Sequence, residues 1–124
     1  QIFNLGARKC LALEKGVLSF DICDLSKQTQ LFNHTWMRLL QQRQSCIASR
    51  VGVTLEPCDN TKTHLRWLHK SLIHSSALVE HFIVENIPKR MCLEAGAHSE
   101  GIRLTECDPG SPFQKWHFTH YYTQ

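Results

Sequence analysis

The chain has 124 residues, of which 42% are hydrophobic and 20% are charged, and its formal net charge is +3 at pH 7. These values are typical of one globular domain with a single core, and they exclude a wholly disordered chain. Its apolar runs are all shorter than the ~18 residues of a membrane-spanning helix. We therefore expect no membrane contact, and the charge is too small to predict a nucleic-acid partner.

Six cysteines in a chain of this length predict disulfides and an oxidising compartment, within the secretory pathway or outside the cell. The C-x2-4-C spacing of zinc ligands is absent, so we expect no metal and no other cofactor. Asn33-His34-Thr35 is an N-glycosylation sequon and agrees with a secretory route. The first residues lack the order of a signal peptide, so we expect Gln1 to follow a cleavage point or to continue a longer protein.

The first element in chain order is a repeat unit over approximately residues 1–40. Leu18 and Phe20 alternate with other residues ahead of Cys23, which predicts a strand with one buried face. An aspartate follows this cysteine at once, and a large aromatic residue, Phe32, stands nine residues after it. A unit of this size cannot bury its own apolar face.

The same unit is repeated over approximately residues 41–75 and 88–124, and the spacing of its cysteines and aromatic residues is similar in each copy. The equivalent residues are Leu11, Ile47 and Leu93 after the first cysteine, Asp24, Asp59 and Asp108 after the second, and Phe32, Trp67 and Trp116 nine residues on. Three such units around an axis bury the three aromatic residues in one core. The copies are separated unequally, and we interpret residues 69–89 as an insertion that forms a longer loop or a hairpin.

Six cysteines permit 15 pairings, and the repeat selects one of them. It predicts the disulfides Cys10–Cys23, Cys46–Cys58 and Cys92–Cys107, one in each unit. Each would close a short loop and stabilise the fold by about 3 kcal/mol.

The segments Gln30-Leu31-Phe32 and Gln114-Lys115-Trp116, with a degenerate copy at Leu65-Arg66-Trp67, resemble the QxW repeats of ricin B-type lectins. The resemblance implies an all-β chain, a single β-trefoil domain over residues 1–124 with lobes α, β and γ. Within that family the chain is similar to the C-terminal lectin domain of polypeptide GalNAc-transferases. A second similarity, over residues 53–67, is to the cysteine-rich domain of the mannose receptor family.

A galactose-type site of this family uses a carboxylate two residues after the first cysteine of a lobe. It also uses an aromatic residue two before the second cysteine and an asparagine just before the QxW glutamine. In lobes α, β and γ, in that order, the carboxylate position holds Ala12, Ala48 and Glu94. The position of the aromatic residue holds Asp21, Glu56 and Thr105, and the position of the asparagine holds Thr29, His64 and Phe113. The resemblance therefore implies a neutral-sugar site in lobe γ alone, with Glu94, Asp108 and Gln114. We expect Glu94→Ala to abolish that binding and to leave the melting temperature nearly unaltered.

A basic face is the alternative site, for an anionic glycan. The other interpretation of these residues is a solvated surface without a ligand. The face comprises Lys62, His64, Arg66, His69 and Lys70, with His74 beyond them. Arg and Lys would bind a sulfate or a sialic-acid carboxylate. Because three of these residues are histidines, such affinity should rise as the pH falls through ~6.5.

The resemblance implies a lectin module that binds GalNAc or galactose on glycans and glycopeptides, tethered to the catalytic domain of a Golgi glycosyltransferase. We expect no catalysis by the domain itself, because it has no Gly-rich phosphate loop or HExxH motif and the repeat accounts for every cysteine. The alternative is an interaction or structural module that has lost neutral-sugar binding, with the QxW residues acting as scaffold.

Overall fold

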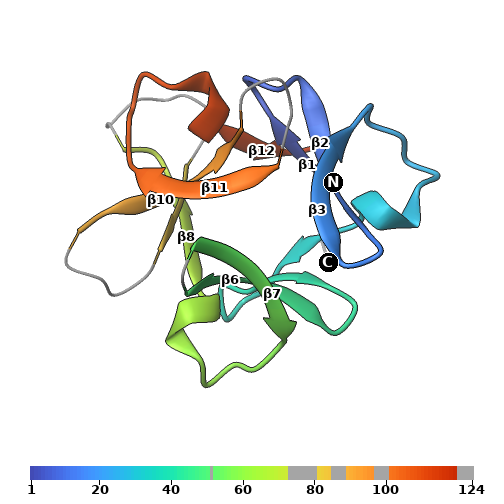
Figure 1. Cartoon of the computed structure of the whole chain (residues 1–124), viewed down its shortest axis with the longest axis horizontal. Coiled ribbons are helices and arrows are strands. Elements are labelled where there is room, and N and C mark those ends of the chain that lie inside the picture. The colour runs from blue at the N-terminus through green and yellow to red at the C-terminus, as the bar shows by residue number, and fades with distance from the viewer. Residues whose placement is uncertain (51, 73–80, 85–88, 97–100, 120–124) are drawn as a thin grey trace.

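Short antiparallel strands and single turns of 3-10 helix form the part of the chain that the computed structural model describes, residues 1–50, 52–72, 81–84, 89–96 and 101–119. They surround a central axis in three lobes (Figure 1). No helix in those ranges is long and apolar enough to cross a membrane. The elements of lobe α are β1 (Ile2–Asn4), β2 (Lys9–Glu14), β3 (Val17–Asp21), η1 (Gln28–Gln30) and β4 (Asn33–His34). Those of lobe β are β5 (Leu40–Gln42), β6 (Ser45–Arg50), β7 (Gly52–Pro57), η2 (Thr63–Leu65) and β8 (Trp67–Lys70). Those of lobe γ are β9 (His81–Val84), β10 (Met91–Ala95), β11 (Ile102–Glu106), η4 (Pro112–Gln114) and β12 (Trp116–Phe118).

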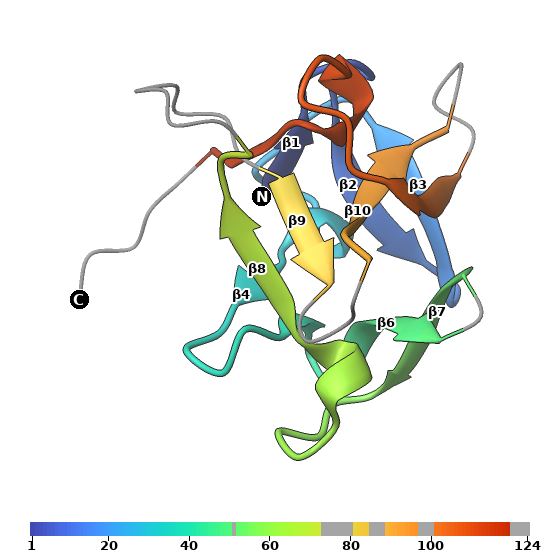
Figure 2. The same cartoon turned by 90° about the vertical axis from the view of Figure 1, so that its left-hand side faces the viewer.

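The hydrogen-bonded sheets connect the lobes to one another. Each sheet has four strands, in the orders β12-β1-β2-β3, β4-β5-β6-β7 and β8-β9-β10-β11, so each takes one strand from the preceding lobe. The first and last strands pair over Ile2–Phe118 to Asn4–Trp116, which joins the two ends of the described chain. This arrangement is a β-trefoil, as the resemblance to ricin B-type lectins implies (Figures 1 and 2).

The same cross-strand contacts recur in all three lobes, which explains the repeated apolar positions. The pairs are Leu11 with Phe20, Ile47 with Leu55 and Leu93 with Leu104. These six residues pack in or against one central core. The disulfides are Cys10–Cys23, Cys46–Cys58 and Cys92–Cys107, the pairs expected from the repeat. They tie the start of β2, β6 and β10 to the loop after the facing strand.

The QxW aromatic residues are structural. Trp67 and Trp116 have no exposed surface, and Phe32 is 5% exposed. Each indole also donates a hydrogen bond to the carbonyl of the residue that follows the first cysteine of its lobe. Trp67 Nε1 donates to Ile47 at 2.9 Å, and Trp116 Nε1 donates to Leu93 at 3.0 Å. The core position expected for these three residues is confirmed.

The hairpin turns at one end of the axis require glycine. Gly16, Gly52 and Gly101 have φ values of 76°, 80° and 72°, a region that residues with a Cβ seldom adopt. They stand at equivalent places in the β2–β3, β6–β7 and β10–β11 hairpins. Around them the three hairpins enclose a hollow of about 420 Å³.

The stretch 69–89 is only partly an insertion. Residues 81–84 form β9, which pairs with Trp67–Lys70 of β8 as one arm of a hairpin, and also with Cys92 of β10. β9 holds the place in lobe γ that β1 and β5 hold in the other lobes, with Phe82 in the central core. The lobe γ repeat therefore begins before residue 88, because its first strand is separated from its first cysteine by a longer connection.

At the axis, the residue two positions after each QxW aromatic turns inward, as strand alternation requires. These residues are His34, His69 and Phe118, and their rings gather around Phe82. Nε2 of His34 donates to the carbonyl of Trp67 at 2.8 Å, and Nε2 of His69 donates to that of Trp116 at 3.2 Å. Burial lowers the pKa of His34, and it lowers the pKa of His69 from 6.5 to about 4.

Candidate functional site

The acidic residue of lobe γ, Glu94, lies on β10 and is largely buried, with 11% of its side chain exposed. Its Oε1 accepts a hydrogen bond from Arg103 Nη2 at 2.9 Å, across the β10–β11 pair. Its Oε2 accepts one from Gln114 Nε2 at 3.1 Å. These two donors hold the carboxylate in one position, and each oxygen has a further lone pair available as an acceptor.

Gln114 and Asp108 shape the turn beside this carboxylate. Gln114 Oε1 accepts from the backbone N–H of Asp108 at 2.7 Å, while its Nε2 donates to the carbonyl of Glu106 at 2.9 Å. Asp108 Oδ1 accepts from the N–H of Gly110, which is an Asx turn. Of the three residues expected at the lobe γ site, Glu94 and Gln114 are in contact, and the Asp108 carboxylate serves the turn.

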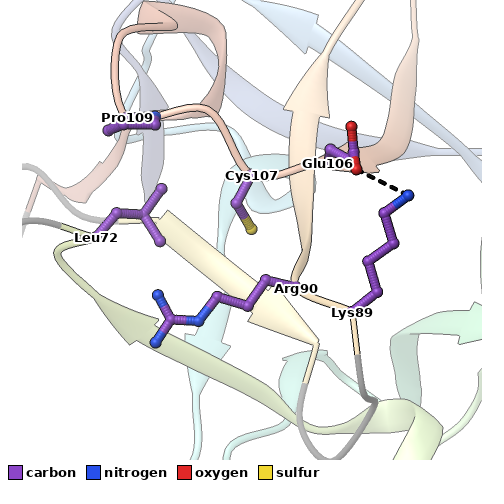
Figure 3. Close-up of a pocket in the computed structure, with 6 residues that line it drawn as sticks. All are labelled: Leu72, Lys89, Arg90, Glu106, Cys107 and Pro109. Atoms are coloured by element: carbon purple, nitrogen blue, oxygen red, sulfur yellow. Dashed lines mark ion pairs between the residues drawn. The ribbon is translucent and has the colours of Figure 1, made fainter.

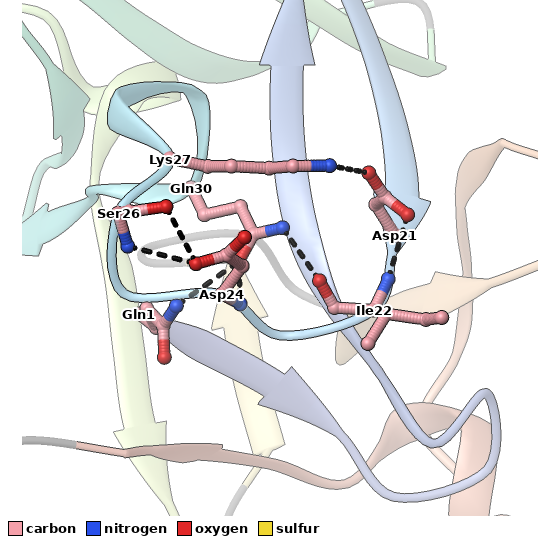
Figure 4. A network of polar contacts seen from close by, with 7 residues as sticks. All are labelled: Gln1, Asp21, Ile22, Asp24, Ser26, Lys27 and Gln30. Carbon is pink, nitrogen blue, oxygen red and sulfur yellow. Dashed lines mark hydrogen bonds and ion pairs between the residues drawn. The ribbon is translucent and has the colours of Figure 1, made fainter.

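Lobe α repeats this turn without the acid (Figure 4). Gln30 is fully buried, accepts from the N–H of Asp24 at 2.9 Å and donates to the carbonyl of Ile22. Asp24 caps its own turn through Ser26. The Gln1 side chain supplies a third hydrogen bond to Gln30, at 3.0 Å. The QxW glutamines therefore act as scaffold in both lobes that retain them.

Lobe β replaces the buried polar pair by an apolar one. Leu65 stands where Gln114 stands in lobe γ, and Ala48 stands where Glu94 stands; both are 0% exposed and share a small second core beside the Cys46–Cys58 disulfide. Substituting both members of a buried hydrogen-bonded pair by apolar residues avoids an unsatisfied polar atom. Lobe β thus keeps its shape without a carboxylate at this position.

A different carboxylate lies on the surface of lobe β. Glu56, at the position expected for a stacking aromatic residue, accepts from His64 at 2.9 Å and pairs with Arg50 at 2.8 Å. The neighbouring His64 holds the position of the family's asparagine. Asp21 is similarly paired with Lys27 in lobe α at 2.7 Å. The sequence indicated the positions of these residues, but their ion pairs could not be predicted from it, because each partner comes from another strand or loop.

The buried location of Glu94 corrects one expectation. A largely buried carboxylate that accepts hydrogen bonds from two side chains contributes to folding as well as to any binding. Its removal leaves Gln114 Nε2 with one partner fewer, so Glu94→Ala should lower the free energy of unfolding by about 1–3 kcal/mol. Loss of sugar binding in that variant would therefore not isolate the role of the carboxylate.

Two of the five residues expected to form a basic face are engaged in other contacts. Lys62 and Lys70 are exposed, but His64 pairs with Glu56, and the ring of His69 stacks on Phe82 with centroids 4.4 Å apart. Because the pKa of His69 is lowered to about 4 by burial, it carries no charge near pH 6. The expected increase in anion affinity through ~6.5 therefore has no contribution from His69. His74 lies outside the described residues.

Lobe γ also carries a surface hollow of about 450 Å³ (Figure 3). Lys89 and Glu106 form an ion pair of 2.8 Å on one side of it, and Arg90 extends toward Leu72 on the other. Elsewhere, the sequon residue Asn33 lies exposed on β4. Its side chain is thus accessible to modification.

Known proteins are similar to this chain in sequence and in fold. No family model matches the chain. It is 35% identical over 123 residues to polypeptide N-acetylgalactosaminyltransferase 5 of Rattus norvegicus, a match that covers 96% of this chain and 13% of the transferase. The chain thus spans about an eighth of that relative's length.

Two solved structures have the same fold. The structure of GalNAc-T7 with UDP, GalNAc and Mn2+ matches 96% of this chain and 22% of its own, with a TM-score of 0.75 and 19% identity. The agglutinin from Abrus precatorius matches 94% of this chain and 44% of its own, with a TM-score of 0.67 and 15% identity. Together with the three disulfide-linked lobes, these similarities confirm the β-trefoil fold and show that the chain is similar in sequence to part of a polypeptide N-acetylgalactosaminyltransferase.

Proposed function

We propose that this domain is the carbohydrate-binding, non-catalytic module of a glycosyltransferase of the secretory pathway. Its ligands are glycans or glycopeptides that carry GalNAc or galactose, and it presents them to a catalytic domain in the same parent protein. The match to only 13% of a polypeptide GalNAc-transferase supports an accessory role, because most of the transferase lies outside the matched segment.

The neutral-sugar site of this proposal is in lobe γ. The supporting observation is the carboxylate of Glu94, which keeps 11% of its side chain exposed and which Arg103 and Gln114 hold in place. A carboxylate fixed in this way can accept hydrogen bonds from the hydroxyls of a sugar without being reoriented first. The alanines at the equivalent positions of lobes α and β offer no side-chain acceptor.

Glu94→Gln is the substitution that tests this site. It keeps the size of the side chain and one acceptor oxygen but removes the charge, so the fold should persist. We expect GalNAc binding to weaken by about tenfold or more, because a hydrogen bond to a charged acceptor contributes roughly 1.5–3 kcal/mol. Calorimetry, or line broadening of the sugar's NMR resonances, measures the affinity.

Glu106→Gln is the matched control, since Glu106 is an exposed glutamate of the same lobe, ion-paired to Lys89. The pair Glu94→Ala with Gln114→Leu copies the apolar arrangement of lobe β and provides a second folded protein without the carboxylate. GalNAc binding that survives in both lobe γ variants would remove Glu94 from the site. A parent chain that binds neither GalNAc nor galactose would favour the interaction or structural module instead.

A further inference from the structure

The N-glycosylation sequon lies at the edge of a sheet, where a bulky group has room. Asn33 is exposed on β4, an end strand of the sheet β4-β5-β6-β7. His34 turns toward the axis, so strand alternation places Asn33 on the outward side. The facing residue, Gln41, donates its side-chain amide to the carbonyl of Arg43 at 2.6 Å. Among the described residues none forms a hydrogen bond with the Asn33 amide, which is therefore available for attachment of a sugar.

Thr35, the hydroxyl residue of the sequon, closes the turn that follows β4. Its Oγ1 accepts from the N–H of Leu39 at 3.1 Å, and its carbonyl accepts from the N–H of Arg38 at 2.8 Å. The turn is also tied to lobe β, because the N–H of Trp67 donates to the carbonyl of Arg38 at 2.8 Å. These hydrogen bonds fix the backbone that carries Trp36, in a turn that projects from the body of the domain (Figure 2).

Trp36 is the most exposed large hydrophobic residue among those that the structure describes, at 89%, and it belongs to neither core cluster. It stands three residues after Asn33, so the backbone keeps their Cα atoms within about 10 Å of each other. A sugar on the Asn33 amide thus extends from the same hairpin end that carries the indole. The C–H face of a sugar ring packs against an indole, because the contact removes apolar surface of both from water.

We propose that Asn33 carries an N-linked glycan whose first sugar residues pack on the indole of Trp36. In the transfer, Nδ2 of Asn33 forms a C–N bond to the anomeric carbon of an oligosaccharide held on a lipid pyrophosphate. The C–O bond to the pyrophosphate breaks, the lipid pyrophosphate leaves, and the amide gives up one proton. This inference rests on the secretory location in the proposed function. It concerns a modification of the domain and not its ligand, and Glu94 lies in a different sheet, on β10.

The first test measures attachment. The chain is secreted from animal cells behind a signal peptide and treated with peptide-N-glycosidase, which releases N-linked glycans and converts the carrier asparagine to aspartate. We expect a fall in mass and, in peptide mass spectrometry, conversion of Asn33. Asn33→Gln and Thr35→Ala should abolish both signals, whereas Thr35→Ser should retain them, because serine also completes the sequon. Asn60→Gln is the matched control, since Asn60 is an exposed asparagine outside any sequon.

The second test measures how far the glycan covers the indole. Trp67 and Trp116 have no exposed surface, so quenching of tryptophan fluorescence by acrylamide reports on Trp36. We expect stronger quenching after enzymatic release of the glycan, and the same stronger quenching in Asn33→Gln. Trp36→Phe should abolish the difference, which assigns the signal to this residue.

Melting temperature provides a further readout of the same contact. Release of the glycan should lower it by a few degrees in the parent and by less in Trp36→Ala, because the packing of sugar on indole stabilises the folded chain. Leu25→Ala is the matched control, since Leu25 is a 61% exposed apolar residue of lobe α. In that variant, release of the glycan should have the same effect as in the parent.

The inference is wrong if the secreted chain shows no fall in mass, if Asn33→Gln retains it, or if release of the glycan leaves the quenching of Trp36 unchanged. It can fail separately from the proposed function. A chain that is glycosylated at Asn33 and binds neither GalNAc nor galactose would overturn only the neutral-sugar proposal. A chain that binds GalNAc through Glu94 and carries no glycan would overturn only the modification of Asn33.

Discussion

Acidification should destabilise this fold through the histidines at its axis, and His69 allows the effect to be calculated. In the unfolded chain its pKa is near the ordinary value of 6.5, whereas burial lowers it to about 4 in the fold. The unfolded state therefore binds the proton first as the pH falls. The stability that the neutral ring contributes is complete above pH ~6.5 and is lost progressively between that value and about 4.

The magnitude follows from linkage. A pKa difference of this size corresponds to about 2 kcal/mol of lost stability at pH ~5, on the order of a fifth of the total stability of a typical domain. The pKa values of His34 and His81 are lowered in the same direction, mainly by burial, so their effects add to it. Urea denaturation of the parent at several pH values between ~7 and ~5 measures the sum.

His69→Phe isolates the contribution of His69. Phenylalanine fits the environment of this position, because Phe118 occupies the equivalent place in lobe γ and its ring lies 5.3 Å from that of His69. At neutral pH the variant should be less stable, since the carbonyl of Trp116 loses its 3.2 Å hydrogen bond. The difference between parent and variant should then shrink by about 2 kcal/mol as the pH falls to ~5. A difference that stays constant over this range would refute the assignment of a buried, neutral His69.

Two further predictions concern the scaffold. Trp116→Ala should destabilise the domain by about 3–5 kcal/mol as a core cavity, visible as a large fall in the thermal melting temperature, and an almost unchanged melt would contradict the full burial of the indole. Removing the Cys46–Cys58 disulfide by a double alanine substitution should lower the free energy of unfolding by about 2–5 kcal/mol in urea. Peptide mapping under non-reducing conditions checks the pairing itself, and a Cys23–Cys46 link or a free thiol would contradict it.

Much of the scaffold could be predicted from the sequence because the repeat encodes it three times. Equal spacing of cysteine, aspartate and aromatic residues locates the disulfides, the turns and the core without any knowledge of the lobes' arrangement. Alternation with a period of two also carries information about β8. It places His69 on the same inward side of β8 as Trp67, and so predicts the burial that removes this histidine from the basic face.

The candidate sites depended on tertiary structure, because their members meet across strands and lobes. Glu94 is held by Arg103 only through the register of β10 against β11, and by Gln114 only through the fold of the following turn. No spacing in the sequence reports such a register.

By itself, then, the sequence determined the threefold repeat, its disulfides and its buried aromatic residues, since each follows from a local pattern repeated along the chain. Only the tertiary structure decided that residues 81–84 form a strand of lobe γ and that Glu94 is buried and hydrogen-bonded. It likewise decided that Trp36 lies beside Arg66, because closing the trefoil brings the β4–β5 turn against the start of β8. The physical reason is the same in each case: contacts between distant segments form only when the three lobes share one core.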